Sequence, residues 1–241
     1  MFIISSLPEC AKPAAFFLRT GCAGLVSTFM KRILLYALVS AALVTATASL
    51  LAGEVEPGFT ALCDGKTFHG WKPAEVNQDA WKIEEGAFVT RGNTCHLFYA
   101  GDEKPFKNFH LKVDVKTDPK SNGGIYFHTK YQRDGWPRGG FECQVNNTQS
   151  DWIKTGSLYG LVNIAGSPAQ DGAWWTQEII VQGNGVTVLI DGKKLLQYNE
   201  PPGAQPGKDF ERKFGEGTFA LQAHDPGSVV RYKNIRVKRL D

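Results

Sequence analysis

The sequence predicts an all-β domain built as a sandwich of two antiparallel sheets. Three observations lead to this fold class. Turn-forming residues recur about every ten positions after residue 60, the runs between them are short and rich in Val, Ile, Phe and Tyr, and no segment keeps a helical period. The turns are expected at Asp64-Gly65, Glu85-Gly86, Arg91-Gly92-Asn93, Asn122-Gly123-Gly124, Asn184-Gly185, Asp191-Gly192 and Pro226-Gly227.

Single strands follow from the alternation of apolar and polar residues. Residues 81–90 form a hairpin about Glu85-Gly86, and residues 176–196 form a second one about Asn184-Gly185, the strongest hairpin signal in the chain. Two stacked sheets require each strand to bury one side. Further strands are expected over residues 108–117, 123–130, 140–147, 217–224 and 229–240, and residues 199–215 are expected to form one long loop.

Residues 30–52 have the layout of a secretory signal peptide. Met30 stands before a Lys-Arg pair, an apolar run begins at Ile33, and small residues follow. We expect cleavage after Ala48, with cleavage after Ala52 as the second choice. A permanent membrane anchor is the alternative, because the apolar run is nearly long enough to cross a bilayer.

The folded domain is expected over residues 57–241, and residues 1–29 form an upstream extension with no assigned role. Residues 1–48 hold four of the 27 basic and one of the 24 acidic side chains, so a cleaved chain carries 23 of each. A neutral domain lacks the basic surface that a phosphate backbone requires, which argues against nucleic acid as a partner. The expected location is periplasmic or extracellular, or membrane-anchored if the segment is not cleaved.

Three of the five cysteines, Cys63, Cys95 and Cys143, belong to the domain. Their spacing fits no zinc-binding pattern. At most one internal disulfide can form, and Cys63 with Cys95 is the first pair to test. The alternative is that all three are buried free thiols.

One face of the central strands carries an unusual set of side chains. In "GFECQVNN", side chains at alternate positions share a face, which separates a polar row from Phe141, Cys143 and Val145. Two other strands present similar groups, and few of them are fixed cations. If these strands are neighbours, they line a shallow groove suited to a neutral polyhydroxylated ligand. The polar set is Tyr126, His128, Glu142, Gln144, Asn146, Gln222 and His224.

Several ordered motifs together resemble the 3-keto-disaccharide hydrolase domain family, from about Gly58 to the C-terminus. They are "GFTALCDGKTFHGWK", "SNGGIYFHT", "GGFECQV", "TGSLYG", "WTQEIIVQGNGVTVLIDGKKL" and "GTFALQAHDPGSVVRYKNIRVKRL". The resemblance implies a concanavalin A-like jelly roll with a concave sugar-binding face, export in bacteria, and action on glycosides whose C3 hydroxyl is already oxidised to a ketone. The fold by itself does not imply this activity, because the same sandwich also serves lectins.

Such a reaction needs a general base near the hydrogen on C2, donors near the enolate oxygen, and an acid for the departing oxygen. Glu142 is the leading candidate for the base, or for the acid if burial raises its pKa. Its structural alternative is an ion pair with Arg138 or Arg231. His224 is the second candidate catalytic residue because imidazole titrates near the working pH, and its alternative is a hydrogen-bonded strand residue.

Amide and aromatic side chains are the candidate substrate-binding groups. The carboxamides of Asn122, Gln144 and Gln222 can hold hydroxyls or the ketone, but they cannot titrate. Tyr126 and Tyr159 can stack on a sugar ring or donate from their hydroxyls, with ordinary packing as the alternative.

His128 stands in "GIYFHT" where relatives are expected to carry Arg, so it departs from the family pattern. It is kept as a substrate-binding candidate. Trp174 and Trp175 point to opposite faces if extended, and Trp174 is expected to form an aromatic platform beside the groove. Trp71, Trp81 and Trp152 are expected to be structural.

No cofactor is expected, although a calcium or other divalent ion stays open as an alternative. Glu142, His128 and His224 could meet as two histidines and a carboxylate around a metal. The expected ligand is a small oxidised sugar or glycoside. No nucleic acid and no lasting membrane association after signal cleavage are expected, and no oligomeric state follows from the sequence.

Two functions compete. The first is an exported enzyme that cleaves 3-keto-glycosides by base-assisted elimination and hydration. The second is a non-catalytic, lectin-like carbohydrate-binding module, and the joint presence of Glu142 and His224 favours the enzyme. An ordinary endoglucanase is disfavoured because Gln144, and not a second acid, stands beside Glu142.

Overall fold

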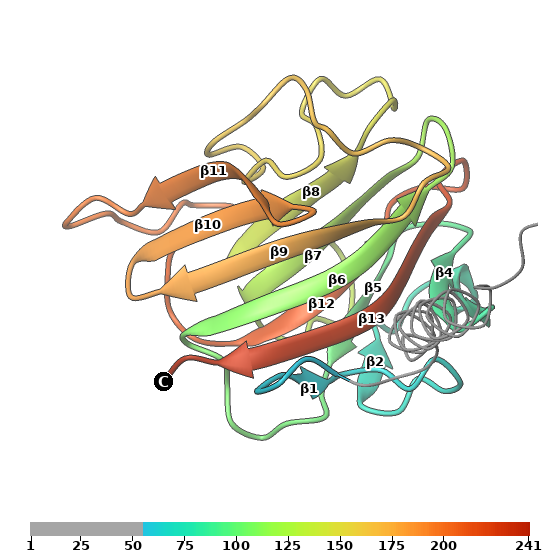
Figure 1. Ribbon diagram of the computed structural model, residues 1–241, viewed down its shortest axis with the longest axis horizontal. Coiled ribbons are helices and arrows are strands. Elements are labelled where there is room, and N and C mark those ends of the chain that lie inside the picture. The colour runs from blue at the N-terminus through green and yellow to red at the C-terminus, as the bar shows by residue number, and fades with distance from the viewer. Residues whose placement is uncertain (1–54) are drawn as a thin grey trace, which may run out of the picture. The chain divides into compact units, whose positions relative to one another are not determined.

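A computed structural model describes residues 55–241, which form two antiparallel β-sheets (Figure 1). The larger sheet has eight strands in the order β11-β10-β9-β6-β13-β4-β3, with β1 paired to β13. Its strands are β1 (Thr60–Ala61), β3 (Trp81–Glu84), β4 (Ala87–Thr90), β6 (Phe109–Thr117), β9 (Trp175–Gln182), β10 (Gly185–Ile190), β11 (Lys193–Asn199) and β13 (Val230–Arg239).

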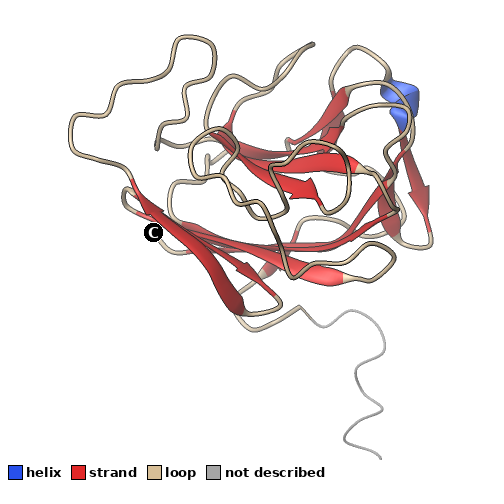
Figure 2. Cartoon of the chain, turned by 90° about the horizontal axis from the view of Figure 1, so that it is seen from above, coloured by secondary structure: helices blue, strands red, loops and turns tan. Residues whose placement is uncertain are grey.

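The smaller sheet has five strands in the order β2-β5-β12-β7-β8. They are β2 (Trp71–Pro73), β5 (Cys95–Tyr99), β7 (Asn122–Thr129), β8 (Phe141–Asn146) and β12 (Thr218–Ala223). Viewed from above, the two sheets lie as stacked layers joined by long loops (Figure 2). The predicted all-β sandwich is therefore confirmed.

Alternation along the strands builds the core between the layers. In β6 every second residue is buried, so Phe109, Leu111 and Val113 face inward while their neighbours stay half-exposed. Ile125 and Phe127 of the smaller sheet are fully buried in the same cluster. Close packing of these side chains supplies most of the hydrophobic stabilisation.

Some sequence predictions differ from the structure. Strands β1, β2 and β5 were not predicted, and the expected turn at residues 122–124 is the start of β7. Cys63, Cys95 and Cys143 are all free thiols, so the Cys63–Cys95 disulfide was wrong and the free-thiol alternative holds. The predicted hairpins and the long loop after β11 are confirmed.

The predicted signal peptide or anchor over 30–52 and the extension over 1–29 lie outside the described residues. Within residues 55–241, none of the helical structure has the length and hydrophobicity needed to cross a membrane.

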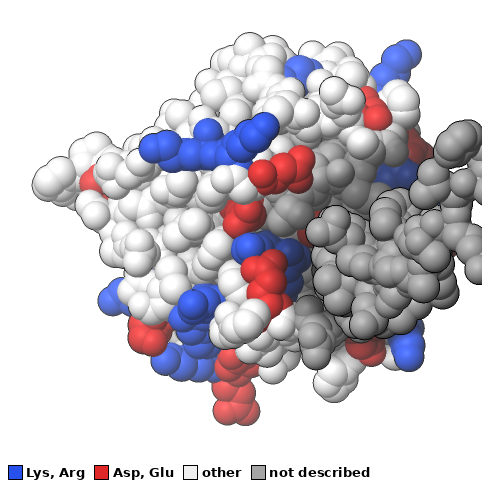
Figure 3. All heavy atoms as spheres, in the orientation of Figure 1, with Lys and Arg blue, Asp and Glu red and all other residues white. Residues whose placement is uncertain are grey.

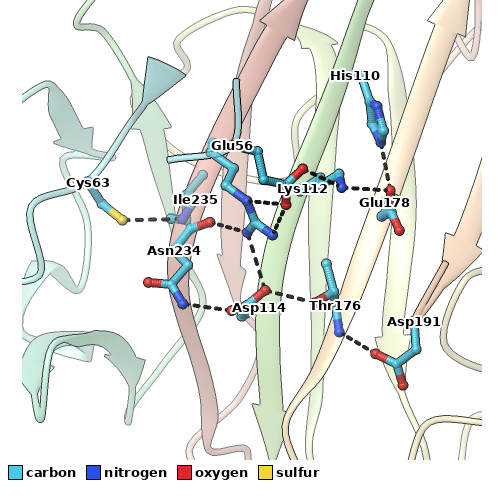
Figure 4. Close-up of polar contacts among 11 residues, drawn as sticks. Glu56, Cys63, His110, Lys112, Asp114, Thr176, Glu178, Asp191, Asn234 and Ile235 are labelled. Atoms are coloured by element: carbon cyan, nitrogen blue, oxygen red, sulfur yellow. Dashed lines mark hydrogen bonds and ion pairs between the residues drawn. The ribbon is translucent and has the colours of Figure 1, made fainter. Parts of the chain in front are cut away.

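The outer face of the larger sheet carries paired charges. Acidic and basic groups are interspersed across the side of the molecule seen in Figure 3. On β6, Lys112 lies between Glu56 and Glu178, with nitrogen–oxygen distances of 2.7 and 3.6 Å, and His110 contacts Glu178 at 2.7 Å (Figure 4). Arg236 of β13 joins Glu56 at 3.0 Å and Asp114 at 3.3 Å.

Candidate active site

A pocket lies on the face of the smaller sheet that turns away from the larger sheet. Its cavity is about 290 Å³, at the lower limit of the size range of small-ligand sites. Strands β7, β8 and β12 form the floor, and the loops over 130–140, 147–174 and 200–217 form the walls. The lining residues are Asn122, Tyr126, Trp136, Pro137, Gly140, Phe141, Glu142, Gln144, Asp151, Tyr159, Phe210, Arg212, Gln222 and His224.

The Glu142 carboxylate lies over β7, the middle strand of the floor, although its own strand β8 is at the edge of the sheet. Glu142 pairs with Tyr126 across β8 and β7, and Gly124 pairs with Gln144. Because Gly124 has no side chain, the Glu142 carboxylate can reach over β7 and accept a 2.8 Å hydrogen bond from Gln222 on β12. A Cβ atom at Gly124 would lie 2.5 Å from Glu142 Oε1. The glycine therefore keeps open the space that the carboxylate occupies.

The acid at the centre of the pocket has a strongly shifted pKa. Burial raises the pKa of Glu142 to about 7, although hydrogen bonds from Tyr126 and Gln222 and the charge of Arg212 act in the opposite direction. Gln222 Nε2 also donates to the Tyr126 hydroxyl at 2.9 Å. Near neutral pH the carboxyl is thus divided between its protonated and ionised forms, which suits proton transfer.

A second titratable group, His224, directly follows β12. Its Nδ1 lies 2.7 Å from Asp225 Oδ2, and Asp225 also accepts from the Ser228 hydroxyl at 2.7 Å and the Gly227 amide at 2.8 Å. Burial raises the pKa of Asp225, but these hydrogen bonds outweigh it and the net pKa is lowered. The carboxylate accepts a hydrogen bond from Nδ1–H, which leaves Nε2 as the ring nitrogen that Asp225 does not hold.

Three buried polar atoms around the floor have no hydrogen-bond partner within the described residues. They are Gln222 Oε1, Asn122 Oδ1 and His96 Nε2. An unpaired buried polar atom is costly, and such atoms concentrate where a ligand or water completes the site. On the wall, the Tyr159 hydroxyl donates to Asp151 at 3.1 Å.

Seven of the nine predicted site residues line this one pocket: Glu142, His224, Asn122, Tyr126, Gln144, Tyr159 and Gln222. The alternative ion pairs of Glu142 are wrong, because Arg231 pairs with Asp118 at 2.7 Å and Arg138 pairs with no carboxylate among residues 55–241.

His128 does not face the pocket. Its φ of 56° and the register shift between β7 and β12 mark a bulge, which breaks the alternation that would have placed it beside Tyr126. The ring instead packs against Phe109 and Phe214, and its Nε2 lies 2.9 Å from the Lys107 carbonyl. Burial lowers the pKa of His128.

Trp174 does not lie beside the pocket either. Lys233 of β13 lies 4.0 Å from the centre of its ring, which places Trp174 against the larger sheet. Trp175 is buried, as expected for one member of the pair. Trp71 and Trp81 are buried too, whereas Trp152 is 59% exposed, contrary to its predicted structural role.

The metal triad that the sequence left open as an alternative does not form among the described residues. His128 lies apart from Glu142 and His224, and no three His, Cys, Asp or Glu side chains of residues 55–241 come together as metal ligands.

Sequence reasoning missed several residues of the site. His96 belongs to the unpredicted strand β5, whose alternation in "CHLFY" could have revealed it, and it pairs in register with Gln222. Trp136 contacts both His96 and His224, with ring centres 5.4 and 5.3 Å apart. Trp136 and Arg212 come from irregular loops, where no periodic pattern marks them.

The comparison with known families agrees with this geometry. Residues 58–238 match the family described as the 3-keto-alpha-glucoside-1,2-lyase-like domain. The chain belongs to this family. The lyase-like domain begins at the predicted Gly58, and the predicted family is confirmed. At this level the protein is a glycosyl hydrolase-like enzyme.

Individual relatives of the lyase-like domain are distant. The 3-keto-disaccharide hydrolase of Bacteroides thetaiotaomicron is 24% identical over 234 residues, covering 76% of this chain and 79% of that protein. A candidate glycosyl hydrolase from Parabacteroides distasonis has a TM-score of 0.62 at 24% identity, covering 76% of this chain and 94% of that one.

The sandwich also occurs outside the family. The exoplasmic domain of VIP36, solved with calcium and Man3GlcNAc bound, has a TM-score of 0.50 at 11% identity and covers 78% of this chain and 90% of that one. These likenesses show the fold, which is the concanavalin A-like jelly roll that the sequence predicted.

Proposed function

We propose that this domain cleaves 3-keto-glycosides by elimination of the group at C1 and hydration of the product. The observation that carries the proposal is the pairing, in one sugar-sized pocket, of Glu142 with a pKa of about 7 and His224 held by Asp225. Membership of the lyase-like family and the name of the Bacteroides relative support the substrate class.

The environments of the two groups suggest their roles. His224 presents a free Nε2 lone pair while Asp225 holds the other nitrogen, so His224 takes the proton from C2. Glu142 has a raised pKa, so it protonates the departing glycosidic oxygen and later takes a proton from the water that adds to C1. Gln222 and Asn122 offer unpaired carbonyl oxygens that accept hydrogen bonds from sugar hydroxyls.

The proposal is tested by incubating the purified domain with 3-keto-trehalose, a 3-keto-β-glucoside and their unoxidised parents, and following release of the ketosugar. We expect turnover of the oxidised sugars only. Glu142→Gln should lower kcat at least about 10²-fold, because it removes the transferable proton and keeps the shape. Equal turnover of the unoxidised parents, or full activity of Glu142→Gln, would contradict the proposal.

A carbohydrate-binding module is the second candidate, because the VIP36 domain of the same fold was solved with a sugar bound. A binding module needs no proton-transfer group, so the raised pKa of Glu142 favours the enzyme. Tight sugar binding without turnover, measured by calorimetry on the same set of sugars, would favour the module over the enzyme.

Export is proposed from residues 30–52. The N-terminal sequence of the protein recovered from a bacterial periplasm tests it. A new N-terminus after Ala48 or Ala52 supports cleavage, and an intact segment in the membrane fraction supports an anchor.

A further inference from the structure

Arg212 is a cation of the pocket wall that has no hydrogen-bond or ion-pair partner within the described residues. It donates no hydrogen bond and forms no ion pair with any residue between 55 and 241, although Glu142 and Asp151 line the same pocket. Five other arginines each pair with a carboxylate, namely Arg91, Arg133, Arg231, Arg236 and Arg239. An unpaired guanidinium in a cavity is suited to a ligand oxygen that carries negative charge.

The structure holds this side chain in place by packing. Its guanidinium nitrogens and carbon would lie 2.4–2.9 Å from a Cβ at Gly160, so the absence of a side chain there makes room for the group. On another side, the Phe210 ring centre lies 5.4 Å from Arg212 Cζ. Arg212 itself has a φ of 43°, a left-handed conformation that an arginine rarely adopts.

The loop that carries Arg212 is anchored on both sides of it. The Glu211 amide donates to the Arg138 carbonyl at 2.8 Å, which ties the loop to the neighbouring wall. After Arg212, Lys213 Nζ and the Phe214 amide bond the two carboxylate oxygens of Glu200 at 3.1 and 3.0 Å. The guanidinium is therefore presented from a fastened segment of backbone.

Arg212 also interacts electrostatically with the centre of the site. Its charge lowers the pKa of Glu142 and of Tyr159, against the larger effect of burial in both cases. The cation is thus close enough to influence charge that develops beside Glu142.

We propose that Arg212 binds the C3 ketone oxygen of the substrate and stabilises the enolate, so that it sets the preference for oxidised sugars. This inference rests on the proposed function. When the base removes the C2 proton, the C–H electron pair forms the C2–C3 double bond and the carbonyl π pair moves onto the C3 oxygen. The guanidinium donates to that oxyanion, a preorganised interaction that strengthens as charge develops.

The oxyanion then returns its electron pair. The C3 carbonyl reforms, the C2–C3 pair becomes the C1–C2 double bond, and the C1–oxygen bond breaks as the leaving oxygen takes a proton from the acid. Water adds to C1 and a proton to C2. A C3 hydroxyl in an unoxidised sugar carries no negative charge at any stage, so Arg212 has nothing to stabilise there.

The test compares Arg212→Gln and Arg212→Lys with Arg91→Gln, an exposed arginine that follows β4 and lies outside the pocket lining and its walls, on 3-keto-trehalose. Arg212→Gln should lower kcat about 10²–10³-fold while KM changes less than about tenfold. Arg212→Lys should keep part of the rate, added guanidinium ion should rescue Arg212→Gln, and Arg91→Gln should match the parent. Circular dichroism and thermal unfolding check that each variant is folded.

The outcomes separate the two proposals. If the parent protein turns over no 3-keto-glycoside, the proposed function fails and this inference fails with it. If the parent is active and Arg212→Gln keeps kcat within about threefold, the inference alone is overturned. A loss confined to KM, or a parent that prefers sulfated or carboxylated sugars through Arg212, would assign the arginine to anion binding and also overturn it.

Discussion

The outer face of the larger sheet and the pocket face of the smaller sheet use similar side chains in opposite ways. On the outer face Glu178 has His110 and Lys112 beside it, and its pKa is lowered, chiefly by the His110 hydrogen bond (Figure 4). In the pocket Glu142 has an amide and a phenol as its hydrogen-bond partners, and its pKa is raised to about 7.

The difference between the two carboxyl groups distinguishes structural charges from charges that can take part in a reaction. A face whose charges are paired gains modest stability and holds no group poised to react. A face with an unpaired arginine, a shifted carboxyl and unpaired buried atoms has given up stability, and such sites are where binding and catalysis concentrate.

The largest effect is expected from replacing His224. His224→Ala should lower kcat/KM about 10²–10⁴-fold on a 3-keto-glycoside, because a general base is lost. His110→Ala on the outer face is the matched control and should leave kcat/KM unchanged. Activity is measured by ketosugar release. Equal losses of kcat/KM in both variants would contradict the assignment of catalysis to the pocket face alone.

Two adjacent glycines sharpen the comparison within one strand. Gly124→Ala would place its Cβ against the Glu142 carboxylate, so we expect kcat to fall at least about tenfold with little change in stability. Gly123 faces the other way, and its Cβ would lie 2.6 Å from the Tyr232 hydroxyl and 3.1 Å from Val230 in the core.

Gly123→Ala should therefore cost about 1–3 kcal/mol of unfolding free energy and leave kcat of the folded fraction nearly intact. Urea unfolding and steady-state kinetics on both variants distinguish the two effects. If both variants lose stability and neither loses kcat, Gly124 does not lie against the Glu142 carboxylate as assigned.

A smaller effect concerns stability against pH. Because the pKa of Glu142 is higher in the folded than in the unfolded chain, the folded state binds more protons between about pH 4.5 and 7, and the stability associated with this group falls as pH rises through that window. Glu142→Gln should therefore stabilise the protein by about 1–3 kcal/mol at pH 8, and by much less at pH 5.

Glu178→Gln should show the opposite sign. Its pKa is lowered on folding, so its contribution is present at neutral pH and is lost as pH falls through the folded pKa. We expect a cost of about 1 kcal/mol at pH 7 that shrinks toward pH 4. Chemical unfolding at several pH values measures the stability change of each variant. If the two variants show the same dependence of this change on pH, the opposite pKa shifts of Glu142 and Glu178 are contradicted.

The sequence by itself determined the fold class and most of the pocket floor. Alternation is a local property of an extended backbone, so Glu142 and Gln144 had to share a face wherever their strand was placed. The same rule failed at His128, because a bulge at that residue depends on how β7 pairs with β12.

Only the tertiary structure decided what those local patterns meant. In the sequence, Gly123 and Gly124 resemble a turn. In the structure, their missing side chains let Tyr232 and Glu142 of other strands lie close to the β7 backbone. Trp136 and Arg212 reach the pocket from irregular loops, and the position of a loop follows from contacts distant in the chain. Burial, which raises the pKa of Glu142, likewise depends on the assembled neighbours and cannot be derived from residue order.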